Sequence, residues 1–337
     1  MKKIIRIGID TSKQLLQVHG VDETERPVLR RQLRRLEVDR FFGSLAPCLV
    51  GLEACGASHY WARVLRSLGH EVRLLPPSYI KPYLKRAQKN DTRDAEAICE
   101  ALGRPSMRFV PVKSEAQQAA LMLHSVRDLL IRQRTMLANA IRGHAAEFGI
   151  VGAKGLGKLS VVLNRVRTSS IPELARDMIE LLAAQLDPLE DKLGTIEDRL
   201  RAWFRESAES RRLATIPGVG VISATRLAMK VPDPGVFQSG RHFAAWLGVT
   251  PRDHSTAGKQ RLGKISRQGD ETLRSLLIVG ATAVIRWAKP GHASPWLLAL
   301  LARKPRKLVA VALANKIARI AWAIMMHGET YQRPTPA

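Results

Sequence analysis

The first 75 residues have the pattern that most constrains the fold, because short apolar segments follow one another with polar turns or helical segments between them. Strands are predicted at residues 3–9, 15–21, 27–33, 48–52 and 71–75, and helices at 36–45 and 58–68. Short polar turns join the first three strands, which therefore form an antiparallel meander, and strand–helix alternation follows. The pattern predicts a mixed α/β sheet.

Four acidic residues fall at special places in this pattern. Asp10 and Glu53 each end an apolar strand, while Asp91 and Asp94 are three residues apart and share one face of a predicted helix. Carboxylates repel one another unless a cation lies between them, so the set predicts a divalent-metal site. Singly, Asp10 could cap a turn and Asp91 could be a helix N-cap. The sheet pattern and its acids are those of a ribonuclease H-type domain.

Charge indicates the partner. The chain has 54 Lys and Arg against 30 Asp and Glu, a formal net charge of +24, which favours phosphate backbones. Charged residues interrupt the apolar segments, so we expect no membrane span and no signal peptide, and an intracellular, cytoplasmic protein. Cys48, Cys55 and Cys99 lack the spacing of a disulfide framework or a zinc site and are expected to be buried as small apolar residues.

Beyond residue 114 the pattern changes to long helices rich in Arg. This segment predicts either a helical or coiled-coil arm or a plain antiparallel helix pair. Residues 211–225 then contain Ile-Pro-Gly-Val-Gly, typical of a helix-hairpin-helix in which backbone N–H groups near Gly218 and Gly220 grip a phosphate. A tight turn that serves packing alone is the alternative. Segments 271–289 and 306–326 are expected to be core helices.

Six motifs occur in one order along the chain, and together they resemble the insertion-sequence 110 family of transposases, close to its 1111 subgroup. They are Gly-Ile-Asp-Thr-Ser-Lys, Glu-Ala-Cys-Gly, Asn-Asp-Thr-Arg-Asp-Ala, Ile-Pro-Gly-Val-Gly, Leu-Gly-Val-Thr-Pro and Gly-Lys-Ile-Ser-Arg-Gln-Gly-Asp. The resemblance implies a RuvC-like domain at 1–113, a coiled-coil linker at 114–208 and a transposase domain at 209–330. It also implies a DNA recombinase guided by a structured RNA.

Carried over to this sequence, the family's acidic tetrad is Asp10, Glu53, Asp91 and Asp94, which would bind Mg²⁺ or Mn²⁺. A polar, basic and Gly-rich loop pair is expected between the apolar helices, and in the family the nucleophilic serine lies in such a Gly-rich loop. It corresponds here to Ser255, with Thr256 as the neighbouring possibility and Ser239 and Ser266 as outside candidates. Basic side chains around that loop would contact phosphates and stabilise the transition state; they are Arg252, Lys259, Arg261, Lys264 and Arg267. A set of phosphate contacts without a catalytic role is the alternative.

Two function classes follow. The first is a recombinase of donor and target DNA in which Ser255 becomes covalently attached to a DNA phosphate, as a dimer or tetramer. The second is a metal-dependent junction-resolving nuclease that cuts DNA with water and forms no covalent intermediate. A basic RNA-binding scaffold ranks last, because it would leave the four acids without a role.

Overall fold

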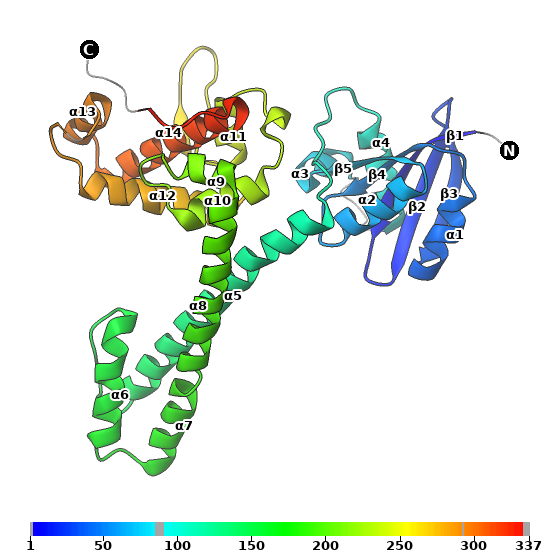
Figure 1. Ribbon diagram of the computed structural model, residues 1–337. Coiled ribbons are helices and arrows are strands. Elements are labelled where there is room, and N and C mark those ends of the chain that lie inside the picture. Colours follow the sequence, from blue (N-terminus) through cyan, green and yellow to red (C-terminus); the bar gives the residue numbers. More distant parts are fainter. Residues whose placement is uncertain (1–2, 85–90, 292, 333–337) are drawn as a thin grey trace. The chain divides into compact units, whose positions relative to one another are not determined.

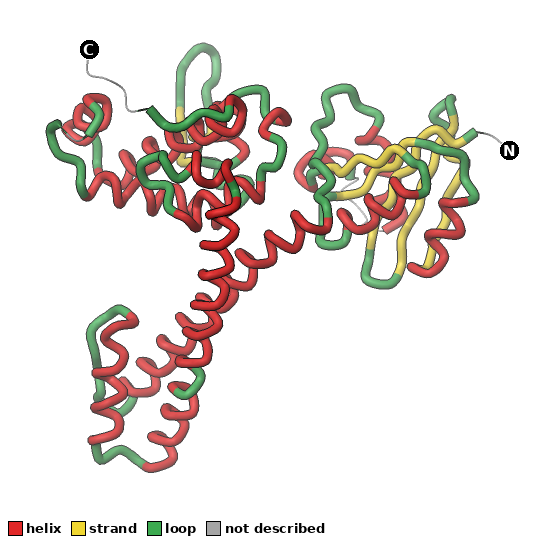
Figure 2. The backbone as a smooth tube through the Cα atoms, viewed as in Figure 1, coloured by secondary structure: helices red, strands yellow, loops and turns green. Residues whose placement is uncertain are grey.

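The computed structural model describes residues 3–84, 91–291 and 293–332, and for Asp91 and Thr92 it describes the backbone alone. The chain divides into two compact units, Met1–Gln118 and Ala119–Ala337. Figure 2 shows the change of character between them: a sheet with helices in the first unit, and almost entirely helices in the second.

The first unit is built on a five-stranded sheet (Figure 1). Its strands are β1 (Ile4–Thr11), β2 (Leu15–Asp22), β3 (Pro27–Arg34), β4 (Leu49–Glu53) and β5 (Glu71–Leu75). They lie in the order β3-β2-β1-β4-β5. The β1–β2 and β2–β3 pairs are antiparallel, whereas β1–β4 and β4–β5 are parallel. The predicted mixed α/β sheet is confirmed.

Helices cover both faces of this sheet, because the strands bury apolar residues on both sides. The helices are α1 (Val38–Gly43), α2 (Ser58–Ser67), α3 (Pro77–Ile80) and α4 (Asp91–Leu102). Ile7, Ile9, Val50 and Leu52 pack with α1 and α2 on one face. On the opposite face α4 packs with α3 and the end of β5. Whether the acids predicted to form a metal site lie close together therefore depends on where α4 begins.

The second unit contains most of the helices. They are α5 (Glu115–Ala146), which begins in the first unit, α6 (Leu159–Thr168), α7 (Glu173–Ala183), α8 (Leu186–Glu206), α9 (Ala208–Leu213), α10 (Val221–Lys230), α11 (Gly240–Trp246), α12 (Glu271–Arg286), α13 (Pro295–Arg303) and α14 (Arg306–His327). One expectation is corrected here. The basic Gly-rich loops contain an antiparallel ribbon of β6 (Pro251–Asp253) and β7 (Leu262–Ile265). These strands have only three and four residues, so the alternation of side chains that marks a strand cannot be recognised in the sequence.

Helices α5 and α8 pack along each other in opposite directions. Arg127 pairs with Glu197 and Arg134 with Glu190, so residue numbers rise along one helix as they fall along the other. Next to these ion pairs Leu130, Leu189 and Leu193 form a small apolar core. Helices α6 and α7 extend the packing onto the far end of α5.

The core of the C-terminal part surrounds α14. Its buried residues, including Ala314, Ile317 and Ala321, pack with α11 and α12. By length and composition alone α14 could also cross a membrane, and it is the one such helix in the described part of the chain. Lys316 and Arg319 interrupt its apolar sequence. The prediction that this segment is a core helix is confirmed for its buried face.

Candidate active site

Two of the predicted acids lie at neighbouring strand ends. Strands β1 and β4 pair in parallel, and the last pair in their register is Ile9 with Leu52. Asp10 and Glu53 follow these residues directly and therefore stand side by side at the carboxyl end of the sheet. A further contact joins the two loops beyond them, since Thr11 Oγ1 lies 3.3 Å from Cys55 Sγ. Cys55 is exposed, so the prediction of a buried thiol was wrong there.

Two glycines allow α4 to lie close to this sheet end. A Cβ atom at Gly8 would lie 2.3 Å from the Ala95 carbonyl oxygen and 2.4 Å from the Cys99 nitrogen. At Gly51 a Cβ would lie 2.8 Å from Leu102 Cδ2. The backbones of β1 and α4 are thus in direct contact, and any side chain at Gly8 would push the helix away.

The same geometry fixes which face the acids share. Side chains of a strand alternate, so Asp10 shares the face of Gly8, and Glu53 shares the face of Gly51. Helix α4 lies on this face, and Asp94 precedes the buried Ala95 by one residue. The structure thereby brings three predicted acids to one region of the first unit. The side chain of the fourth, Asp91, lies outside the described residues, although α4 begins at its backbone.

Electrostatics agree with this clustering. Burial raises the pKa of the Glu53 carboxyl, the negative charge of Asp94 raises it further, and Lys81 opposes the shift. Burial and a like charge both disfavour the ionised form. A cation at this place would relieve both effects.

The side chains are the oxygen donors that a hard divalent cation prefers. Among the described side chains, however, no three acids, histidines or cysteines are arranged to hold a metal ion as they stand. That set does not include the side chain of Asp91, so the fit rests on donor type and on the raised pKa of Glu53. On both counts the residues suit such an ion.

The predicted nucleophile lies on the β6–β7 ribbon. Thr256 and Lys259 pair across its tip, and Ala257 and Gly258 between them both have positive φ, of 49° and 78°. Two successive residues of positive φ form the tight hairpin turn that suits the twist of a ribbon. Ser255 therefore lies one residue before this turn, at an exposed tip.

Local hydrogen bonds hold Ser255. Its hydroxyl donates to the Asp253 carboxylate, its backbone N–H donates to the same oxygen at 2.8 Å, and the Arg261 N–H donates to Ser255 Oγ at 3.0 Å. The hydrogen bonds from the side chain and backbone of Ser255 lower the pKa of Asp253. An ionised carboxylate thus accepts the hydrogen bond of the exposed serine.

The other serine candidates have different surroundings. Ser239 caps α11, where its hydroxyl accepts from the His242 N–H at 3.2 Å. Ser266 carries a buried hydroxyl that has no hydrogen-bond partner among the described residues. Ser255 is the candidate that combines exposure with an acceptor for its proton.

Comparison with known proteins identifies the family. Residues 7–149 match a transposase family model whose name specifies a DEDD domain of the IS110 type, and residues 210–296 match the model described as "Transposase IS116/IS110/IS902 family". The chain belongs to the IS110/IS116/IS902 family of transposases.

Relatives that match nearly the whole chain support this assignment to the family. The chain is 55% identical over 337 residues to the putative transposase y4pF/y4sB of Sinorhizobium fredii, and the match covers 99% of this chain and 87% of that protein. A probable family 20 transposase of Pseudomonas aeruginosa is 50% identical, with 98% of each chain covered. The transposase for insertion sequence element IS1111A of Coxiella burnetii is 36% identical, with 98% of this chain and 92% of that protein covered.

In this transposase the two glycines of the Pro-Gly-Val-Gly turn differ in their surroundings. Gly218 has φ of +89°, and a Cβ there would lie 2.8 Å from the Gly280 carbonyl oxygen of α12. Packing is therefore a sufficient reason for glycine at this position. Gly220 is the N-cap of α10, and a Cβ there would meet nothing within 4 Å. A small cavity of about 220 Å³ adjoins it, lined in part by Arg201 and Glu197.

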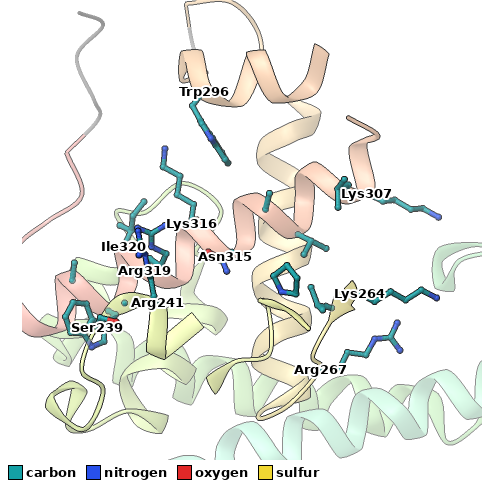
Figure 3. Close-up of a pocket in the computed structure, with 18 of the residues that line it drawn as sticks. Ser239, Arg241, Lys264, Arg267, Trp296, Lys307, Asn315, Lys316, Arg319 and Ile320 are labelled. Atoms are coloured by element: carbon teal, nitrogen blue, oxygen red, sulfur yellow. The ribbon is translucent and has the colours of Figure 1, made fainter. Parts of the chain in front are cut away.

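Sequence reasoning missed part of the basic surface of the second unit. Lys264 and Arg267 were predicted to contact phosphates, and both line a cavity of about 1410 Å³ (Figure 3). Further cations reach the same cavity from α11 and α14: Arg241, Lys307, Lys316 and Arg319. On α14 these residues are spread among apolar ones, so the segment was expected to be core alone. One side of α14 is core, and another lines the cavity.

Proposed function

We propose that this transposase cuts and rejoins DNA at an insertion-sequence end, with Ser255 as nucleophile and the tetrad Asp10, Glu53, Asp91 and Asp94 as ligands of Mg²⁺ or Mn²⁺. One observation carries the proposal more than any other: the pairing of β1 with β4, which brings Asp10 beside Glu53 under the start of α4. The exposed, hydrogen-bonded Ser255 supports the second part.

The proposed chemistry is a transesterification. Ser255 Oγ forms a bond to the scissile phosphorus as the bond between phosphorus and a deoxyribose oxygen breaks, and that oxygen leaves with a proton as a hydroxyl. The serine proton passes to Asp253, whose carboxylate already accepts its hydrogen bond, and Asp253 then donates that proton to the leaving deoxyribose oxygen. A hydroxyl of the exchanged strand then attacks the phosphoserine, which joins the new DNA strand and regenerates serine.

The basic residues around the ribbon would neutralise charge on the phosphate that is transferred. We assign this role to Arg252, Lys259, Arg261, Lys264 and Arg267, with the turn at Gly218 and Gly220 gripping a DNA phosphate as a helix-hairpin-helix. The bound divalent cation would supply further charge stabilisation at the phosphoryl group. Within the protein, Asp10 and Glu53 would act by holding it in a fixed position.

We propose donor DNA, target DNA and a structured guide RNA as partners, in the cytoplasm at the nucleoid. A net charge of +24 supports polyanionic partners, because each phosphate contact releases counterions. The guide RNA rests on the family resemblance. Target choice would then be determined by base pairing, with protein contacts to phosphates setting position.

We further propose the domain boundaries 1–113, 114–208 and 209–330, with a RuvC-like domain, a helical arm and a transposase domain. A dimer or tetramer through the arm is supported by an apolar stripe on α5. Met122, Val126, Leu129 and Met136 are all exposed there at successive spacings of four, three and seven residues, which fit a heptad that Gln133 interrupts. A second copy of α5 would cover this stripe.

The alternative function is a metal-dependent hydrolase that resolves DNA junctions with water. The experiment that separates the two is denaturing electrophoresis of the full chain incubated with labelled element-end DNA, the guide RNA and Mg²⁺. A protein–DNA adduct that survives denaturant and is lost in Ser255→Ala supports the recombinase. Cleavage that persists in Ser255→Ala without any adduct in the wild type supports the hydrolase. Thr256→Val tests the neighbouring candidate in the same way: the adduct should persist in this variant if Ser255 is the nucleophile, and its loss there instead would assign the role to Thr256.

A further inference from the structure

The cavity beside the ribbon has the composition of a binding groove for a charged, partly apolar ligand. Its volume is about 1410 Å³, and six cationic side chains line it. They are Arg241, Lys264, Arg267, Lys307, Lys316 and Arg319. Among the described residues no Asp or Glu lines the cavity, and none of the six forms an ion pair. A groove lined by cations without acids favours the binding of an anion.

The shape of the groove follows from α14. Residues from Lys307 to Ala323 line it at helical spacing, which corresponds to about 24 Å along the helix axis. The opposite, buried face of the same helix packs in the core, which fixes the position of this wall. In Figure 3 the cations gather toward both ends, with Lys264 and Lys307 at one and Arg241 and Arg319 at the other. This length suits several phosphates of one strand.

An aromatic side chain adds a second element of recognition. Trp296, on α13, is 40% exposed and points into the groove, where Lys316 Nζ lies 4.5 Å from the centre of its ring (Figure 3). The other tryptophan of the groove, Trp322, is fixed to the wall, because its indole N–H donates to the Pro234 carbonyl oxygen at 3.1 Å. Lys316 lies over one face of the Trp296 ring, so a base would stack on the opposite face.

We infer that this groove binds a single strand of nucleic acid, with its phosphates on the Lys and Arg side chains and an unstacked base on Trp296. Stacking platforms within basic grooves are how proteins hold single strands without reading sequence. A duplex fits less well, since its base faces are covered by neighbouring pairs. The inference rests on the proposed function and deepens it: Pro251 and Gly263 of the ribbon also line the groove, so the strand held there would lead to the Ser255 ribbon.

The chain offers a matched control for the tryptophan. Trp287 is 71% exposed and has Arg286 5.7 Å from the centre of its ring, but it does not line the groove. Trp296→Ala should weaken binding of fluorescent dT12 or rU12 to the full chain by about 5-fold to 100-fold, the value of one stacked base. Trp296→Phe should retain most of the affinity, and Trp287→Ala should leave it unchanged.

Salt dependence tests the phosphate contacts. Removing one such contact should reduce the slope of log K against log salt by about 0.7 for a single strand. Lys264→Gln with Arg267→Gln should therefore flatten the slope by about 1.4. The double variant Lys154→Gln and Lys192→Gln removes the same charge from exposed positions of the second unit outside the groove, and it should change the slope less.

The two oligonucleotides identify the source of the strand. If Trp296→Ala weakens binding of dT12 alone, the groove binds DNA, and if it weakens binding of rU12 alone, the groove binds RNA. If it weakens binding of both, the groove accepts single strands of either kind. Each of these results supports the inference. Equal affinities of Trp296→Ala and wild type for both oligonucleotides, with unchanged circular dichroism melting, would overturn the inference. Binding needs no catalysis, so this result would leave Ser255-dependent adduct formation untouched, and failure of adduct formation would leave the groove untouched.

Discussion

The acidic site of the first unit and the serine ribbon of the second place their carboxyl groups in opposite electrostatic environments. Burial and Asp94 raise the pKa of Glu53, whereas hydrogen bonds from Ser255 lower the pKa of Asp253. The first carboxyl is in a place that disfavours its charge and would be stabilised by a cation from outside. The second carboxyl is exposed and is already stabilised by hydrogen bonds from Ser255, so it is ionised without a bound cation.

The two sites also differ in what holds them. Asp10 and Glu53 owe their positions to sheet pairing and to the close contact of α4 with Gly8. Ser255 owes its position to a short turn and to hydrogen bonds within about six residues. Long-range packing thus positions the acidic site, and local backbone geometry positions Ser255. Substitutions at the two sites can test this difference.

The largest effect is expected at the acids. Asp10→Asn or Glu53→Gln should abolish strand exchange, because each removes a ligand charge without changing size. Binding of RNA, which depends on Lys and Arg, should remain near the wild-type level. Strand exchange and filter binding measured on the same preparations test this. Wild-type recombination rates in Mg²⁺ for both variants would contradict the acidic-site assignment.

The next effect concerns the contact between β1 and α4. Gly8→Ala places a methyl group against backbone atoms that cannot move separately, so it should cost about 2 kcal/mol or more of unfolding free energy in the first unit. Gly56→Ala is the matched control, because a Cβ there meets nothing within 4 Å and the change should stay within about 0.5 kcal/mol. Chemical denaturation of both variants provides the measurement, and equal stability would mean that α4 is not held against Gly8.

These contacts indicate how far sequence alone could lead. Strand and helix order was readable up to residue 75, and Asp10 and Glu53 could be recognised as strand ends. Nothing local, however, marks Gly8 or Gly51 as the contacts of α4, because their role depends on a helix more than 40 residues away. The groove was missed for a related reason: the cations of α14 are separated by apolar residues, and only the folded chain brings them to one cavity with Arg241, Lys264 and Arg267.

A smaller effect should separate the two glycines of the turn. Gly218→Ala forces a side chain into positive φ and against Gly280, at a cost of about 1–3 kcal/mol to the stability of the second unit. Gly220→Val lies in extended backbone with open space around it, so melting should fall less than in Gly218→Ala, by no more than the cost of a poorer N-cap. If Gly220 approaches a phosphate, its variant should still bind DNA less tightly, and equally so for two unrelated sequences. Unchanged DNA affinity in folded Gly220→Val would leave the turn as a packing element alone.

The smallest expected effect is on stability as pH changes, and it connects the acidic site to its cation without any activity measurement. Because the pKa of Glu53 is raised in the folded state, the unfolded chain binds fewer protons at this residue between the ordinary value of 4.5 and the raised one. The stability of the first unit should therefore decrease as pH rises through that window, and Glu53→Gln should be less affected. Above the window, without divalent cations, the variant should melt higher than the wild type.

Adding Mg²⁺ should reverse that order, since an ion that binds only the folded chain stabilises it by an amount that grows with its concentration relative to its dissociation constant. The wild type should gain melting temperature with Mg²⁺, and Glu53→Gln should gain less. Asp39→Asn serves as the control, because this acid lies on α1, which packs on the opposite face of the sheet from α4. If Mg²⁺ raised the melting temperature of wild type and Glu53→Gln by the same amount, the ion would bind elsewhere. The contrast between an acidic site stabilised by a cation and a ribbon stabilised by its own hydrogen bonds would then not hold.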